Sequence, residues 1–275
     1  MERAAAMTST SPIRIGVAGA MGRMGHALVA AAKGRDDAAV TVLFDRPEFA
    51  GQTPEGLTAP LGDMAAAVAG CDVIMDFTTP TSSLALARAC AEAGGPALVC
   101  GTTGVSEADE AMLRSSAAKI ALVRTGNFSL GLNLMLGLVR QAAAALPARD
   151  WDVEVFEAHH RRKVDAPSGT ALMLGAAAAK GRGVALADVS ERGRDGLTGP
   201  RAPGAIGFTA MRAGGIIGEH SVVFAAEDEI ITFAHSARDR SLFARGAMAA
   251  ALWVAGRPAG LYDMMDVLGF DKDDA

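Results

Sequence analysis

Five short apolar runs constrain the fold most strongly, because polar or glycine-rich turns follow them and helical stretches lie between them. Uninterrupted apolar runs of this length are typical of strands that are buried on both faces of a parallel sheet. Strands that alternate with helices predict a doubly wound parallel sheet, an α/β fold. The predicted strands are Ile13–Ala18, Val40–Phe44, Asp72–Phe77, Ala97–Cys100 and Ile120–Val123.

The pattern changes after residue 129. A long apolar helix is followed by an alternating strand, a second helix and several longer strands, which predicts an α+β region with a mixed or antiparallel sheet open on one face. Its predicted elements are helix Leu130–Leu146, strand Trp151–Glu157, helix Pro167–Lys180, a loop over Gly181–Ala205, strands within Ile206–Ser236 with turns at Gly214–Gly215 and Glu227–Asp228, and helix Asp239–Ala255.

This change of pattern predicts two domains. Residues 1–12 are expected to form a disordered tail, and residues 13–129, completed by 239–275, to form a Rossmann-type dinucleotide-binding domain. Residues 130–238 are expected to form the second domain.

Composition excludes several classes of protein. A net charge of -5 and a pI near 5.6 give no support for nucleic-acid binding. No apolar run reaches the roughly 18 to 20 residues that a membrane span needs, and the first twelve residues lack the apolar core of a signal peptide, so a cytoplasmic protein is expected. Three cysteines without metal-ligand spacing predict small buried side chains rather than disulfides or a metal site.

The glycine loop after the first predicted strand indicates a dinucleotide site. Gly19, Gly22 and Gly25 are spaced three apart, which departs from G-x-G-x-x-G, and aligning the last two glycines places Ala20 at the first position. Glycines let the backbone approach a pyrophosphate at the N-terminus of the next helix, where Arg23 would add a positive charge. A tight turn without a ligand would explain the glycines alone.

An acidic residue favours the dinucleotide interpretation over a simple turn. Asp45 lies 20 residues after Gly25 at the end of the second predicted strand, where an acid binds the adenosine ribose hydroxyls. Arg46 follows directly, so the pair is compatible with NADH through the acid and with NADPH through the guanidinium. The loops Gly101–Gly104 and Thr125–Phe128 follow the fourth and fifth strands and should face the cofactor, although ordinary turn chemistry explains them equally well.

The densest cluster of reactive side chains lies in Glu157–Ala171. Two of the five histidines are adjacent here beside three cations, and Pro167 suits the first position of a helix whose start offers N–H and hydroxyl donors. His160, Lys163 and this helix start would bind a small dianionic substrate, and a histidine would donate a proton during reduction of a polarised double bond. A solvated basic loop would explain the cations but not the paired histidines.

Glu157–Ala171, read as E-A-H-H-x-x-K-x-D-A-P-S-G-T-A, resembles the signature of the 4-hydroxy-tetrahydrodipicolinate reductase (dihydrodipicolinate reductase) family. The resemblance extends over about Ile13–Leu268. It also includes the G-A-M-G-R-M-G loop, G-T-T-G, the N-F-S at Asn127–Ser129, Ile206–Phe208, Gly218–His220 and Gly260–Met264.

This resemblance implies reduction of a cyclic dicarboxylic imine with NADH, NADPH or both, on the diaminopimelate route to lysine. It also implies that residues 130–238 form the substrate-binding and oligomerisation domain, with a homotetramer assembled through its sheet. It implies that His159 is the general acid and that Lys163 assists protonation. His160, Gly169 and Thr170 would bind the substrate carboxylates. The implied cofactor residues are Gly19, Ala20, Met21, Gly22, Arg23, Met24, Asp45, Arg46, Gly101, Thr102, Thr103, Thr125, Gly126, Asn127 and Phe128.

Two other functions are compatible with part of the sequence. An acylating semialdehyde dehydrogenase would share the Rossmann half but needs a nucleophilic cysteine, for which Cys100 is the candidate. A non-catalytic dinucleotide sensor would keep Gly19, Gly22 and Asp45 without needing His159 and Lys163 together.

Overall fold

The computed structural model describes residues 11–49, 51–53 and 61–270. The chain forms two compact units, one containing the segments Met1–Phe128 and Phe243–Ala275 and the other Ser129–Leu242. The predicted disordered tail, residues 1–12, lies outside the described residues except for its last two positions.

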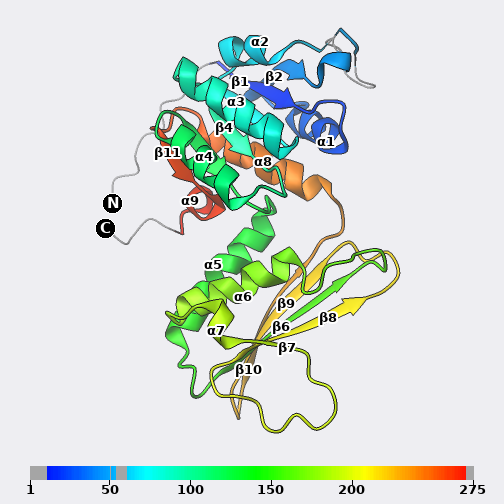
Figure 1. Ribbon diagram of the computed structural model, residues 1–275, viewed down its shortest axis with the longest axis vertical. Coiled ribbons are helices and arrows are strands. Elements are labelled where there is room, and N and C mark those ends of the chain that lie inside the picture. Colours follow the sequence, from blue (N-terminus) through cyan, green and yellow to red (C-terminus); the bar gives the residue numbers. More distant parts are fainter. Residues whose placement is uncertain (1–10, 50, 54–60, 271–275) are drawn as a thin grey trace. The chain divides into compact units, whose positions relative to one another are not determined.

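The first unit is built on a six-stranded sheet with the order β11-β5-β4-β3-β1-β2, and every neighbouring pair is parallel (Figure 1). Five of its strands are the five apolar runs, which confirms the predicted doubly wound sheet. The strands are β1 (Ile13–Ala18), β2 (Ala38–Phe44), β3 (Val73–Asp76), β4 (Ala97–Cys100), β5 (Ala121–Arg124) and the short β11 (Gly260–Tyr262).

Helices cover both faces of this sheet, which explains why its strands are continuously apolar. Val73 and Met75 of β3 pack into the core beneath α1 and α8, whereas Ile74 packs into the core beneath α2, α3 and α4. The helices are α1 (Arg23–Ala32), α2 (Met64–Gly70), α3 (Pro80–Ala93), α4 (Glu107–Ala117), α8 (Ser241–Val254) and α9 (Met264–Leu268), with a 3-10 turn at Pro47–Phe49.

The second unit is built on a five-stranded mixed sheet with the order β10-β9-β6-β8-β7. β9 is antiparallel to β6 and β10, whereas β8 is parallel to β6 and β7. Helices α5 and α6 pack on one face. The elements are α5 (Leu130–Ala145), β6 (Asp152–His159), α6 (Gly169–Gly181), α7 (Leu186–Val189), β7 (Ser190–Arg192), β8 (Ile206–Arg212), β9 (Glu219–Ala225) and β10 (Ile230–Ser236).

The start of α6 differs from the sequence prediction. Pro167 was expected at the first helical position, but the helix begins at Gly169. The side chain of Ser168 accepts a hydrogen bond from the Ala171 N–H at 3.1 Å and so occupies the N-cap position. Pro167 therefore precedes the cap. At α3 a proline does occupy the first helical position, since Thr79 is the N-cap and Pro80 the first helical residue.

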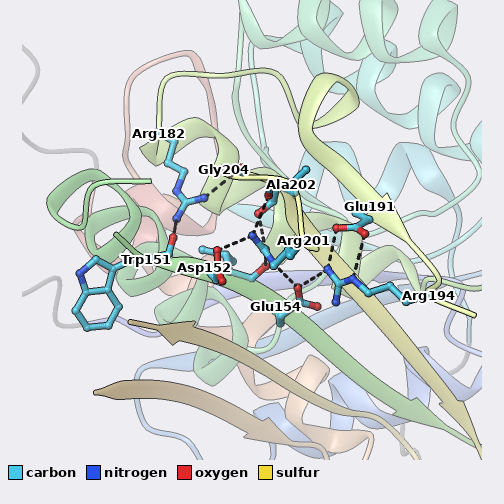
Figure 2. A network of polar contacts seen from close by, with 11 residues as sticks. Trp151, Asp152, Glu154, Arg182, Glu191, Arg194, Arg201, Ala202 and Gly204 are labelled. Carbon is cyan, nitrogen blue, oxygen red and sulfur yellow. Dashed lines mark hydrogen bonds and ion pairs between the residues drawn. The ribbon is translucent and has the colours of Figure 1, made fainter. Parts of the chain in front are cut away.

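The segment expected to be a loop between residues 181 and 205 contains α7 and β7 and is held to β6 by arginines (Figure 2). Arg201 donates to the carboxylates of Asp152 and Glu154 at 2.7 and 3.0 Å and to three backbone carbonyls. Arg194 donates to Glu154 at 2.8 Å and also binds Glu191. Because these contacts join the segment to the strand that carries the histidines, they anchor the edge of the second sheet.

Among the residues that the structure describes, no helix is both long and apolar enough to cross a membrane.

Candidate active site

The glycine loop of the first unit is packed so tightly that two of its glycines are obligatory. Gly19 has a φ of +72°, in the left-handed region that favours glycine. A Cβ on Gly25 would lie 2.6 Å from the Cα of Ala20, so α1 rests directly on the loop. Gly22 is the N-cap of α1 and has no side chain to cap it. The first N–H groups of this helix therefore have no side-chain cap, as an anion-binding helix start requires.

Asp45 connects the end of β2 to the glycine loop. Its carboxylate accepts the Met21 N–H at 2.8 Å through one oxygen and the Arg46 N–H at 2.8 Å through the other. The guanidinium of Arg46 is exposed, pairs with Glu48 at 2.8 Å and lies over the ring of Phe49. An acid and an exposed guanidinium thus lie side by side after β2, the position at which the sequence predicts a ribose-binding site.

A cavity of about 480 Å³ opens beside these residues, entirely within the first unit. Of the predicted cofactor residues, it is lined by Gly19, Met21, Gly22, Asp45 and Arg46. Sequence reasoning missed Pro47, Phe49, Thr78 and Thr79, which also line it. The available signal was the position of Thr78 and Thr79 directly after the third strand, since ligands bind at the carboxyl ends of such strands.

The other predicted cofactor loops lie at the carboxyl ends of β4 and β5. Gly101 lies against the ring of Phe77, where a Cβ would come within 2.6 Å of the ring, and Phe77 packs on Phe128 with centroids 5.2 Å apart. The hydroxyl of Thr102 is buried and accepts hydrogen bonds from the Thr78 N–H and the Ser83 hydroxyl at 3.1 and 2.7 Å. Thr102 therefore binds the neighbouring loop with its side chain, and the cavity described above is not lined by it.

The second unit holds its reactive groups at the end of β6. Glu157 and His159 are two residues apart on this strand and so point to the same face. Nδ1 of His159 lies 2.6 Å from Oε2 of Glu157. The guanidinium of Arg212 on β8 donates hydrogen bonds to both oxygens of the same carboxylate, at 2.7 and 2.8 Å. Glu157 is 0% exposed and His159 only 9%.

The ionisation of Glu157 follows from these contacts. Burial alone would raise the pKa of the carboxyl, but hydrogen bonds from Arg212, His159 and the Ser168 N–H outweigh burial and place that pKa below its ordinary value. The ionised carboxylate accepts, so Nδ1 of His159 carries a proton and donates it.

The start of α6 is tied to the same group of side chains. Ser168 donates its N–H to Oε1 of Glu157 at 3.1 Å, and its hydroxyl lies 3.2 Å from Nε2 of His220. The ring of His220 meets that of His159 edge to face, with centroids 5.0 Å apart. Burial, together with the neighbouring His159, lowers the pKa of His220 to about 4, so His220 is neutral near pH 7. Ser168, the N-cap of α6, thus contacts both Glu157 and His220. Gly169 and Thr170 come next in the chain, at the positive end of the helix dipole.

The loop between β6 and α6 carries the remaining predicted substrate residues. Lys163 pairs with Asp165 at 2.8 Å, and the Lys163 hydrogen bond holds the pKa of Asp165 below its ordinary value. Within the described part of the chain, the buried Nδ1 of His160 has no hydrogen-bond partner. The backbone carbonyl of Asp165 accepts from Arg212 at 2.6 Å, which fixes the loop against β8.

Glu157, Arg212, Ser168 and His220 belong to this cluster but were not predicted as site residues. Glu157 could have been found, because a residue two positions before a histidine on a strand shares its face. Arg212 and His220 lie more than fifty residues away in the sequence, and only the pairing of β6 with β8 and β9 brings them here.

Cys100 is unsuited to act as the nucleophile of an acylating dehydrogenase. Its side chain is fully buried, and burial, together with the charge of Asp76, raises the pKa of the thiol to about 11. A nucleophilic cysteine needs a lowered pKa and access to substrate. Cys71, Cys90 and Cys100 are all free and buried, which confirms their prediction as small buried side chains.

Comparison with known proteins shows family matches across both units. Residues 13–128 match the N-terminal part of dihydrodipicolinate reductase, and residues 131–268 match its C-terminal part. The 4-hydroxy-tetrahydrodipicolinate reductase of Caulobacter vibrioides is 60% identical over 263 residues, covering 96% of this chain and all of that protein. The enzyme of the same name from Dinoroseobacter shibae is 52% identical, covering 92% and 97%.

A solved structure is similar in fold. The dipicolinate-bound dihydrodipicolinate reductase from Paenisporosarcina sp. TG-14 matches with a TM-score of 0.75, covering 93% of this chain and 98% of that one. The two sequences are 24% identical, so this likeness concerns the fold alone.

Proposed function

The chain belongs to the dihydrodipicolinate reductase family, and from this premise we propose that it reduces 4-hydroxy-tetrahydrodipicolinate to tetrahydrodipicolinate with NADH or NADPH, in the diaminopimelate route of lysine biosynthesis. The reaction adds a hydride and a proton to a cyclic dicarboxylic imine and releases water.

The first unit, within the predicted boundaries 13–129 and 239–275, would hold the dinucleotide. The uncapped start of α1 and the tightly packed glycine loop fit a pyrophosphate, and Asp45 fits the adenosine ribose. Arg46, exposed beside Asp45, would bind a 2′-phosphate where NADPH is used. The loops Gly101–Thr103 and Thr125–Phe128 complete the proposed site together with Arg23 and Met24. When bound, the reduced nicotinamide supplies the hydride.

The second unit, predicted as residues 130–238, would bind the substrate. Two carboxylates need at least two cationic or N–H donor groups. Lys163 and His160 provide side-chain donors, and the start of α6 at Gly169 and Thr170 provides backbone donors at the positive end of a helix dipole. When Lys163 binds a substrate carboxylate, it exchanges its contact with Asp165 for one with the ligand.

His159 is proposed as the proton donor. Its Nδ1–H is bound to Glu157, so Nε2 is the nitrogen that can give up a proton to the substrate. Loss of the C4 hydroxyl and a C3 proton as water would first give a C3–C4 double bond conjugated with the imine. Hydride addition at C4 of this double bond would leave an electron pair on the enamine, and the proton from Nε2 would be taken up at the neighbouring carbon, C3. Lys163 assists by holding positive charge close to the substrate.

The proposal depends most on one observation at the end of β6: the buried carboxylate of Glu157 is hydrogen-bonded both to His159 and to the backbone N–H of Ser168 at the start of α6. A coupled assay tests it. Freshly made 4-hydroxy-tetrahydrodipicolinate should cause oxidation of NADH or NADPH, followed at 340 nm, with tetrahydrodipicolinate as product. Dinucleotide binding without turnover would favour the sensor instead.

Exposed apolar side chains on the face of the second sheet opposite to α5 and α6 support the proposed homotetramer. Strand register places Phe156, Met211 and Ile230 on the face opposite to α5 and α6, where they are 37%, 43% and 68% exposed. Apolar side chains on an open sheet face are typical of a surface that pairs with another copy. Light scattering should report four chains in wild type, and fewer in Phe156→Asp. A reductase that draws on the NAD(P)H pool would act in the cytoplasm.

A further inference from the structure

Glu157 has more partners than a structural carboxylate needs. It is fully buried, and it accepts hydrogen bonds from Arg212 twice, from the Ser168 N–H and from Nδ1 of His159. A buried carboxylate is costly unless it is paired and its lone pairs are satisfied. Arg212 alone donates two parallel hydrogen bonds to the carboxylate and balances its negative charge, so Glu157 does not need the histidine for this purpose.

The contact with His159 has a consequence for the histidine. A carboxylate that accepts from Nδ1 fixes the tautomer and the ring orientation, and it stabilises the imidazolium. Nε2 is then the nitrogen whose protonation changes. A Cβ on Gly218 would lie 3.2 Å from Nε2, so a glycine at this position keeps the space beside that atom free of a side chain.

We infer that Glu157, held in place by Arg212, is a positioning residue that orients His159 and stabilises its imidazolium form for proton delivery from Nε2, an inference that rests on the proposed reductase function. The same carboxylate binds the Ser168 N–H. It therefore joins the proton donor on β6 to the N-cap of α6, the helix proposed to bind the substrate carboxylates.

Several charged or titratable groups face His159, and they determine the sign of the expected effects. Glu157 on β6 contributes a negative charge, Arg212 on β8 a positive one, and His220 on β9 is neutral near pH 7. Lys163 in the following loop is close enough to act electrostatically on His220, and its positive charge is partly balanced by Asp165.

The pH dependence of kcat tests the inference. Protonated His159 is required, so activity falls on the basic side of the profile as His159 loses its proton. Glu157→Gln removes the negative charge, so the basic limb should move to lower pH by about one to three units, and kcat at pH 7 should fall by about 10- to 100-fold. Arg212→Met leaves the carboxylate less neutralised, so its basic limb should move in the opposite direction.

Glu154→Gln is the matched control. Glu154 lies on the same strand three residues before Glu157, so its side chain points to the opposite face of the sheet. There it binds Arg194 and Arg201 (Figure 2). This variant should keep the wild-type basic limb, and Glu157→Gln should keep wild-type affinity for NADPH. An unmoved basic limb in Glu157→Gln, whether or not thermal stability falls, would overturn the inference.

A second measurement separates this inference from the proposed function. The ¹⁵N resonances of His159 in the wild-type protein without substrate should show Nδ1 protonated across the titration, with the change confined to Nε2. A neutral form protonated at Nε2 would overturn the inference. Absence of turnover by the wild-type enzyme would contradict the proposed function, whatever the tautomer.

Discussion

Gly25→Ala tests the proposed phosphate site through one added methyl group. Gly25 lies in the first turn of α1 and is buried against the glycine loop. The new Cβ would lie 2.6 Å from the Cα of Ala20 and 2.8 Å from its carbonyl carbon. Carbon atoms prefer separations of about 3.5 to 4.0 Å, so helix and loop must separate by roughly 1 Å. The obstructing atoms are backbone, which cannot move aside as a side chain can.

Two quantities should change. Overpacking of this kind costs about 1 to 3 kcal/mol, and about 1 kcal/mol corresponds to a fall in Tm of roughly 2 to 4 °C in a domain of this size. The loop that is displaced carries Gly19 and Met21, which line the cavity proposed for the dinucleotide. We therefore expect Tm to fall by about 2 to 12 °C and the Kd for NADPH to rise at least about 10-fold, equivalent to about 1.4 kcal/mol.

Calorimetric titration with NADH and NADPH, together with thermal unfolding, measures both effects. Gly70→Ala is the matched control, because its Cβ would meet only the side chain of Val42 at 3.8 Å at the end of α2. The control should keep Kd and Tm near wild type. Wild-type dinucleotide affinity in Gly25→Ala would refute the placement of the phosphate site at this loop.

Three further substitutions test separate parts of the account. Asp45→Ala removes the carboxylate that accepts the Met21 N–H and that is proposed to bind the ribose. The Kd for NADH should therefore rise about 10-fold or more, and it should rise by a larger factor than the Kd for NADPH. The reverse ranking in titrations would show that the acid is misassigned. Lys163→Ala should raise KM for the cyclic substrate and lower kcat, and unchanged steady-state kinetics would remove Lys163 from the anion site. Cys100→Ser should retain kcat within about 2-fold, because the buried thiol takes no part in the proposed reaction; loss of turnover with retained fold would revive the acylating alternative.

Much of the first unit was predictable from the chain alone. Strands buried on both faces leave continuous apolar runs, and β1 and β4 have the predicted boundaries. β11 was missed because three residues beginning with Gly260 carry too little pattern; it becomes a strand by pairing with β5. β7 is equally short, and its segment is held by the Arg194 and Arg201 contacts with Glu154.

The candidate site was predictable only where its residues lie close together in the sequence. His159, Lys163 and the start of α6 belong to one short segment, so their grouping could be anticipated. Arg212 reaches Glu157 because β8 pairs with β6, and no local pattern indicates that pairing. The predicted start of α6 was two residues too early, because proline is common at the first helical position and Pro167 was placed there. In the structure Ser168 is the N-cap and the helix begins at Gly169.

The central claim, that His159 delivers the proton during reduction, is tested most directly by the turnover of His159→Gln with freshly made 4-hydroxy-tetrahydrodipicolinate. Wild type should oxidise NADPH in proportion to product formed. The variant should bind NADPH as wild type does while its kcat falls by about 10²- to 10⁴-fold, the usual contribution of general acid catalysis. Near wild-type kcat in this variant, with normal NADPH affinity, would contradict the account.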